Sequence, residues 1–236
     1  MSAPWGNVWG RAWMLLTPIE VPPDGVRSGR VQVWRADLDH PPVEMDTLER
    51  TLSGDERARA GRFHRPCDRN RSVAARGLLR FLLGDALDCL PSDVRFRYNA
   101  HGKPALASSH ARLGFNLSHS AGVALFALAW DREVGVDIER VPAVIDVGTL
   151  TRLEQYMPAD EAVALLSLPL SSLPLAFCRA WVRGEAYCKA LGTGFPDAPL
   201  PQGQAQWTRL DLDVGPEYRA ALVLSETESE TEGTRF

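Results

Sequence analysis

The stretch Val123-Ala124-Leu125-Phe126-Ala127-Leu128-Ala129-Trp130 is apolar throughout, and Val134-Gly135-Val136-Asp137-Ile138-Glu139-Arg140 follows it after three residues. The first segment has the continuous apolar composition of a buried strand. The second alternates between apolar and polar residues, as a strand with one buried face does. Asp131-Arg132-Glu133 is short enough for a turn, so we predict an antiparallel hairpin here.

Working outward from this pair, the pattern alternates between strands and helices. We predict strands at 31–38, 96–98, 207–212 and 218–224. We predict helices from Ser53 or Asp55 to about His64, from Asp68 to about Asp88, within 148–167, and at about 175–191. Similar residues recur in two of the helices (Ala75-Arg76-Gly77 and Val182-Arg183-Gly184), which favours an internal repeat.

The predicted fold class is therefore α/β (α+β), with two similar halves that each pack a small antiparallel sheet against helices. We place the halves at residues 29–112 and 113–224. An irregular lead-in, 1–28, precedes them, and an acidic tail without aliphatic residues, 225–236, follows them and is expected to be disordered.

The composition excludes several protein classes. With 45% hydrophobic and 24% charged residues and a net charge of −4, the 236-residue chain is neither a coiled coil nor a collagen. It has no apolar run long enough to span a membrane and no signal-peptide pattern. Its four cysteines have no CxxC spacing, so we expect a cytoplasmic protein without structural zinc or disulfides.

The predicted strand 134–140 carries the first candidate site. Side chains alternate along a strand, so Gly135, Asp137 and Glu139 share one face, with the two carboxylates about 7 Å apart. Carboxylate oxygens at this spacing can converge on a hard cation such as Mg²⁺. The missing side chain at Gly135 is expected to leave room for a ligand. The alternative interpretation is a solvated strand face.

The predicted helix 175–191 adds Glu185 and Lys189, one turn apart on the flank of an apolar face. That face is predicted to comprise Phe177, Ala180, Trp181, Gly184, Cys188 and Leu191. Glu185 suits a third metal ligand or a base, and Lys189 suits a phosphate. The alternative is an ordinary ion pair between residues four apart on a helix.

Arginines gather between Arg57 and Arg80. This segment contains eight arginines and one aspartate, a formal charge of +7, so the rest of the chain carries −11. Arginine suits bidentate contacts with phosphate. A solvated helix face and an RNA-binding surface are the alternatives, and the acidic remainder of the chain argues against RNA.

Taken in order, five motifs resemble those of the 4′-phosphopantetheinyl transferases of the larger type, which activates surfactin synthetase. The match covers roughly residues 30–224. The motifs are Arg62-Phe63 with Arg71-Ser72, Gly102-Lys103-Pro104, Phe115-Asn116-Leu117-Ser118-His119-Ser120, Gly135-Val136-Asp137-Ile138-Glu139, and Trp181-Val182-Arg183-Gly184-Glu185-Ala186-Tyr187-Cys188-Lys189.

This resemblance implies a monomeric pseudo-dimer that binds coenzyme A between its halves. It implies transfer of the phosphopantetheine arm to a serine of an acyl, peptidyl or aryl carrier protein domain, with release of adenosine 3′,5′-bisphosphate. The resemblance assigns Mg²⁺ to Asp137, Glu139 and Glu185, catalysis to Glu185 and Lys189, and coenzyme A to Arg59, Arg71, Ser72, Lys103, Ser118, His119 and Lys189.

The resemblance leaves some points open. A further acidic site falls on either Asp160 or Glu161, and Gly184 stands where the family has a lysine. We expect Gly184 to allow close packing of its helix against a strand. The rival functions are a catalytically weak coenzyme A-binding homologue and a Mg²⁺-dependent hydrolase of nucleotide pyrophosphates.

Overall fold

The computed structural model describes residues 16–22, 31–107, 112–145, 148, 159–193 and 207–226. Its strands are β1 (Thr17–Ile19), β2 (Val31–Asp37), β3 (Phe96–Tyr98), β4 (Pro104–Leu106), β5 (Leu113–Ser120), β6 (Val123–Trp130), β7 (Val134–Arg140), β8 (Trp207–Leu212) and β9 (Tyr218–Ser225). Its helices are α1 (Met45–Thr51), α2 (Gly54–Ala60), α3 (Pro66–Ala86), α5 (Ala159–Leu166) and α6 (Leu173–Leu191), with a short 3-10 helix η2 (Pro91–Asp93).

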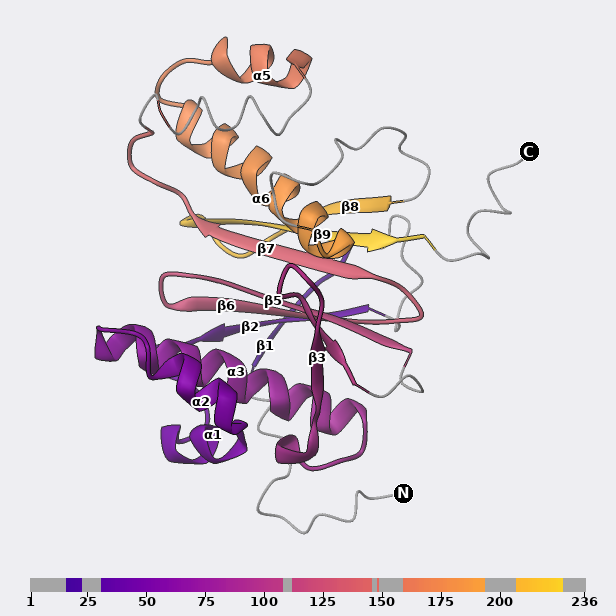
Figure 1. Ribbon diagram of the computed structural model, residues 1–236. Coiled ribbons are helices and arrows are strands. Elements are labelled where there is room, and N and C mark those ends of the chain that lie inside the picture. Colours follow the sequence, from indigo (N-terminus) through magenta and orange to yellow (C-terminus); the bar gives the residue numbers. More distant parts are fainter. Residues whose placement is uncertain are drawn as a thin grey trace, which may run out of the picture.

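The strands form two larger antiparallel sheets and one small hairpin. One sheet has the order β1-β2-β6-β5, the other has the order β7-β9-β8, and β3 pairs with β4 alone. Helices α1 to α3 cover the outer face of the first sheet, and α6 covers the outer face of the second (Figure 1). The molecule therefore has four layers, with helices outside and two sheets inside.

Alternation of side chains along the central strands explains the layers. On β6, Ala124, Phe126 and Leu128 pack against the core beneath α1 to α3. The intervening Leu125 and Ala127 pack between the two sheets, against Val136 and other residues of the second sheet. Because both faces of β6 are buried, its sequence is apolar throughout.

The small antiparallel sheets packed with helices confirm the predicted fold class. The strands at 96–98, 123–130, 134–140 and 207–212 have the predicted bounds, and the other two predicted strands each differ by one residue at their C-terminal end. Thr17–Ile19, which we expected to be irregular, forms an edge strand beside β2. Within the described residues, no helix is both long and apolar enough to cross a membrane.

The predicted hairpin between β6 and β7 is wrong. β6 pairs with β2 and β5, whereas β7 pairs with β9 in the other sheet. Asp131 has a φ of 63°, which turns the chain away from the first sheet. The Glu133 amide then donates to the Ser225 hydroxyl (2.9 Å), and this bond begins the pairing of β7 with β9. The chain thus changes sheets at 131–133, later than the boundary at 112 predicted for the halves.

Candidate active site

The candidate site lies where β5 and β7, each an edge strand of its sheet, run beside each other. Alternate side chains of β5 accept hydrogen bonds from the backbone of β7. The acceptors are Asn116 for the Val136 amide (3.0 Å), Ser118 for the Ile138 amide (3.4 Å) and Ser120 for the Arg140 amide (3.1 Å). Polar side chains therefore satisfy backbone donors that an edge strand would otherwise leave unpaired.

Asp137 is the most buried carboxylate of the site, with 3% of its surface exposed. Its Oδ1 accepts hydrogen bonds from the Ser118 hydroxyl (2.7 Å) and from the Lys189 ammonium (2.6 Å). Among the described residues, nothing donates to its buried Oδ2. A buried carboxylate oxygen without a partner is costly, so this atom is suited to bind a cation or ligand.

Glu139 and Glu185 add negative charge around Asp137. Burial raises the pKa of Glu139, and the Asp137 charge raises it further, although a hydrogen bond from the Ser120 hydroxyl (2.6 Å) opposes this. Burial, followed by the charge of Asp137, also raises the pKa of Glu185. A bound cation would offset this repulsion, and hard oxygen donors of this kind suit Mg²⁺.

These carboxylates do not form a complete metal site in their present positions. In the described part of the chain, no group of three or more His, Cys, Asp or Glu side chains is close enough to hold a metal ion as it stands. Lys189 currently neutralises Asp137 Oδ1 instead. Asp137 Oδ2 has no partner among the described residues, and the charges of Asp137, Glu139 and Glu185 act on one another, so the chemistry of these oxygen donors suits a divalent cation.

Gly135 sets the position of α6, which carries Glu185 and Lys189. A Cβ atom at Gly135 would lie 2.0 Å from the Ala186 carbonyl oxygen and 2.4 Å from the Ala190 nitrogen. The space beside Gly135 is therefore filled by the helix backbone, and our expectation that it receives a ligand is wrong. Close packing of a strand against the α6 backbone thus occurs at Gly135.

The buried face of α6 also differs from the predicted one. Val182, Ala186 and Ala190 pack against β9 of the second sheet. Phe177 and Trp181 stack on each other and pack with α5 instead. Small alanines allow the helix to approach the sheet closely, whereas the aromatic residues fill a separate core. This rotation directs Lys189 toward Asp137.

The turn between β3 and β4 is attached to the end of the same helix. The Lys103 ammonium donates to the Ala190 carbonyl (2.8 Å) and pairs with Glu133 (2.8 Å). The Asn99 amide donates to the Gly192 carbonyl (2.6 Å). These bonds satisfy carbonyls at the helix end, which lack partners within the helix. Lys103 therefore links the turn between β3 and β4 to the end of α6.

His119 points to the opposite side of β5 from Ser118 and Ser120. Its pKa is lowered, because partial burial and the positive charges of Lys189 and Arg71 disfavour the imidazolium. Arg71 itself forms a bidentate pair with Asp39 (2.7 and 2.8 Å). The His119 imidazole is therefore near the Lys189 and Arg71 cations, whose charges are paired with Asp137 and Asp39.

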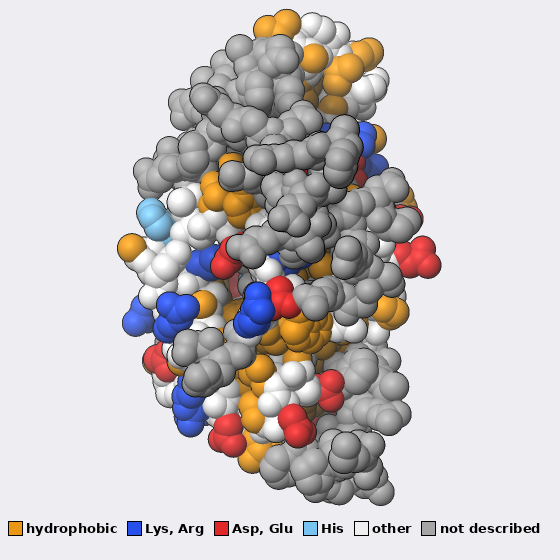
Figure 2. All heavy atoms as spheres, turned by 90° about the vertical axis from the view of Figure 1, so that its right-hand side faces the viewer, with side chains coloured by type: hydrophobic (Ala, Val, Ile, Leu, Met, Phe, Trp, Pro, Cys, Tyr) orange, Lys and Arg blue, Asp and Glu red, His pale blue; other side chains and the backbone are white. Residues whose placement is uncertain are grey.

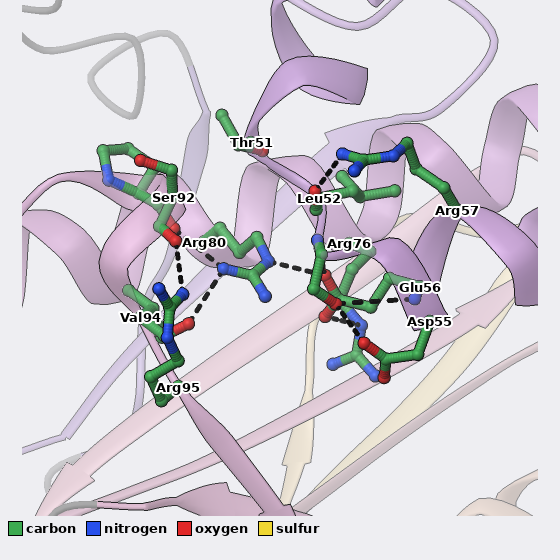
Figure 3. Close-up of polar contacts among 12 residues, drawn as sticks. Thr51, Leu52, Asp55, Glu56, Arg57, Arg76, Arg80, Ser92, Val94 and Arg95 are labelled. Carbon is green, nitrogen blue, oxygen red and sulfur yellow. Dashed lines mark hydrogen bonds and ion pairs between the residues drawn. The ribbon is translucent and has the colours of Figure 1, made fainter.

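The remaining arginines of the 57–80 cluster have mixed roles. Arg80 is 2% exposed and pairs with the buried Glu56 (2.7 Å), while it donates to two backbone carbonyls (Figure 3). Arg76 pairs with the same carboxylate. These two arginines stabilise the core. Figure 2 shows basic and acidic side chains interspersed over the described part of the face that it draws.

The structure shows no contact between the carboxylates and the other predicted residues that it describes, Arg59 and Ser72. Arg59 is exposed and stacks over the Tyr98 ring at 5.2 Å, and Ser72 is half-buried on α3. Asp160 and Glu161 belong to α5, but their side chains lie outside the described residues. Arg183 pairs with Asp211 of β8, away from Asp137.

Sequence reasoning missed Asn99, Asn116 and Ser120. The alternation of Asn116, Ser118 and Ser120 with Phe115 and Leu117 was a visible signal that one face meets polar groups. Nothing local indicates that Asn99 binds a carbonyl 93 residues away.

Comparison with known families covers most of the chain. Residues 39–130 match the family model described as 4′-phosphopantetheinyl transferase, N-terminal, and residues 133–228 match the 4′-phosphopantetheinyl transferase superfamily. The chain is 41% identical over 169 residues to 4′-phosphopantetheinyl transferase HetI of Nostoc sp.. The aligned residues cover 71% of this chain and 70% of the relative.

Two further relatives are more distant. The chain is 29% identical over 151 residues to 4′-phosphopantetheinyl transferase psf-1 of Bacillus pumilus, covering 64% of this chain and 62% of the relative. It is 25% identical over 193 residues to the human L-aminoadipate-semialdehyde dehydrogenase-phosphopantetheinyl transferase, covering 78% of this chain and 62% of the relative.

Proposed function

Because the chain belongs to the 4′-phosphopantetheinyl transferase superfamily and is a transferase, we propose that it moves the phosphopantetheine arm of coenzyme A to a serine of a carrier protein domain. The observation that carries the proposal is the group formed by Asp137, Glu185 and Lys189. A buried carboxylate with a free oxygen, a second carboxylate and a cation meet where the two sheets adjoin.

We assign a Mg²⁺ ion to Asp137 and Glu139, with Glu185 as the third ligand or as the base. Asp137 Oδ2 is the atom with no partner among the described residues, which supports its assignment as a ligand. When bound, the ion would neutralise charge on the pyrophosphate of coenzyme A. Lys189 lies within 2.6 Å of Asp137, so its ammonium is placed to hold the same phosphates.

The reaction is a phosphoryl transfer. The serine oxygen of the carrier forms a bond with the β-phosphorus of coenzyme A, and the bond from that phosphorus to the bridging oxygen breaks. The serine proton passes to Glu185, directly or through a water molecule, and adenosine 3′,5′-bisphosphate leaves with the bridging oxygen. The raised pKa of Glu185 makes this carboxylate a better proton acceptor than an exposed glutamate.

Coenzyme A recognition is assigned to His119, Lys189 and Arg71, which lie close enough for the two cations to lower the pKa of His119. Arg59, Ser72, Ser118 and Lys103 complete the assignment. Lys103 already binds Ala190 and Glu133, so its role toward the 3′-phosphate needs a direct test. If Lys103 or Arg71 holds that phosphate, its replacement by alanine weakens binding of coenzyme A more than binding of dephospho-coenzyme A. Equal losses of affinity for the two ligands would mean that these side chains do not contact the 3′-phosphate.

The function is tested by incubating the purified protein with Mg²⁺, coenzyme A and an unmodified carrier domain, and then weighing the carrier by mass spectrometry. We expect a gain of one phosphopantetheine and release of an equal amount of adenosine 3′,5′-bisphosphate. A carrier with alanine in place of its acceptor serine is the control, and it should gain nothing.

The other outcomes identify the rivals. Release of nucleotide without a carrier would support a pyrophosphate hydrolase. Binding of coenzyme A without any transfer would support the inactive homologue. Binding of RNA with a steep salt dependence, and no response to coenzyme A, would support an RNA-binding protein. The cytoplasmic location and the monomeric state also remain proposals, and sedimentation analysis tests the latter.

A further inference from the structure

The Ser120 hydroxyl makes two hydrogen bonds that together fix its direction. It accepts the backbone amide proton of Arg140 (3.1 Å) and donates to Oε2 of Glu139 (2.6 Å). A serine hydroxyl has only one proton to donate. Because the amide proton occupies a lone pair of the oxygen, the hydroxyl proton is directed toward the carboxylate.

The same arrangement recurs two residues earlier on β5. The Ser118 hydroxyl accepts the Ile138 amide and donates to Asp137 Oδ1. Asn116, two residues earlier again, accepts the Val136 amide. The pattern repeats every two residues along both strands. Each serine therefore accepts the backbone amide of one β7 residue and donates to the carboxylate of the residue before it.

We propose that Ser120 is a positioning residue that orients Glu139 toward the divalent cation. The inference rests on the proposed function, since it concerns the same carboxylates. A free glutamate side chain samples several rotamers, and ordering it on binding costs free energy. The Ser120 hydroxyl holds Oε2 in place before the cation arrives, and Oε1 is the oxygen that we assign to the cation.

Metal ligands in proteins are commonly held by such neighbouring donors, whose removal typically weakens metal binding about 10–100-fold. Ser120 is half-buried and Arg140 is an exposed residue, so we expect water to replace the serine at the Arg140 amide. The metal-binding loss should therefore exceed any loss of stability. A purely structural role for Ser120 would change stability and leave cation affinity as it was.

The test is the affinity of the full chain for Mn²⁺, measured by electron paramagnetic resonance with saturating coenzyme A. We expect Ser120→Ala to weaken Mn²⁺ binding at least about tenfold. Ser120→Thr keeps the hydroxyl and should restore most of the affinity. Should Ser120→Ala fail to fold, Ser120→Cys, which is a weaker donor of similar size, should show a smaller loss in the same direction.

Ser225→Ala is the matched control. The Ser225 hydroxyl also accepts a backbone amide of the β7 region, that of Glu133, and it lies at the other end of the strand from Glu139. Its variant should bind Mn²⁺ like the wild type. If Ser120→Ala binds Mn²⁺ normally while the wild type modifies a carrier, this inference fails and the proposed function stands. If the wild-type protein binds no Mn²⁺, the metal assignment fails as well.

Discussion

Replacing Gly135 by alanine should displace the helix that carries Glu185 and Lys189. The added Cβ would lie 2.0 Å from the Ala186 carbonyl oxygen and 2.4 Å from the Ala190 nitrogen, and both contacts are with helix backbone. Contacts of Cβ atoms below 3.0 Å are essentially never found in proteins. The helix must therefore move away from β7 by at least 1.0 Å, because no flexible side chain can absorb the clash.

This displacement has two measurable consequences. Overpacking of a core typically costs about 1–3 kcal/mol, so the free energy of unfolding should fall by at least that amount. A misplacement of about 1 Å can also reduce catalysis about a hundredfold, so activity should fall in the molecules that remain folded. The two losses arise from the same movement of α6 relative to Asp137.

Urea unfolding gives the stability of Gly135→Ala. Its activity is measured as carrier modification without urea, at a temperature well below the melting point. Gly54→Ala is the control with the same chemical change, since a Cβ at Gly54 meets nothing within 4 Å. That variant should be as active as the wild type. The packing argument is refuted if Gly135→Ala unfolds at the wild-type urea concentration and retains wild-type activity.

Three further changes probe other parts of the molecule. Burial raises the pKa of Glu185, so the folded state keeps a proton that the unfolded chain has released, and this group lowers the stability of the fold as pH rises. Urea unfolding should therefore show that Glu185→Gln gains more stability relative to the wild type at pH 8 than at pH 4. An equal difference at both pH values would contradict the raised pKa. Lys189→Ala should lose most of its kcat/KM for carrier modification, whereas Arg183→Ala, whose exposed ion pair contributes at most about 1 kcal/mol, should stay near the wild type, and the reverse order would mean that the phosphate-binding residue is misassigned. Arg80→Met should destabilise the protein by about 1–3 kcal/mol by chemical denaturation, because it leaves the buried Glu56 carboxylate with Arg76 as its remaining cation and removes the donor to two backbone carbonyls, and an unchanged stability would show that the pair matters little.

The features of the site that follow a local period could be predicted from the sequence. A period of two along 134–140 places Gly135, Asp137 and Glu139 on one face, and the structure turns that face toward α6. The fold class followed in the same way, because alternating and continuous apolar runs depend on which faces are covered. These inferences required no knowledge of distant contacts.

The errors concern which element lies opposite a residue. The gap beside Gly135 could equally well receive a ligand or a helix, and only tertiary packing decides between them. A three-residue connection after β6 could form a hairpin or lead into a second sheet, and the contact between Glu133 and Ser225 of β9 selects the latter. The binding of Lys103 to the end of α6 joins residues 87 positions apart, which no local pattern can reveal.

We infer above all that the Asp137 carboxylate supports transfer of phosphopantetheine to a carrier serine. The most direct test is the intact mass of one carrier domain after incubation with coenzyme A, Mg²⁺ and either the wild-type protein or Asp137→Ala, with folding of the variant verified by circular dichroism. We predict one phosphopantetheine per carrier with the wild type and an unchanged mass with the folded variant. An unchanged mass with the wild type, or full modification by Asp137→Ala, would contradict the account.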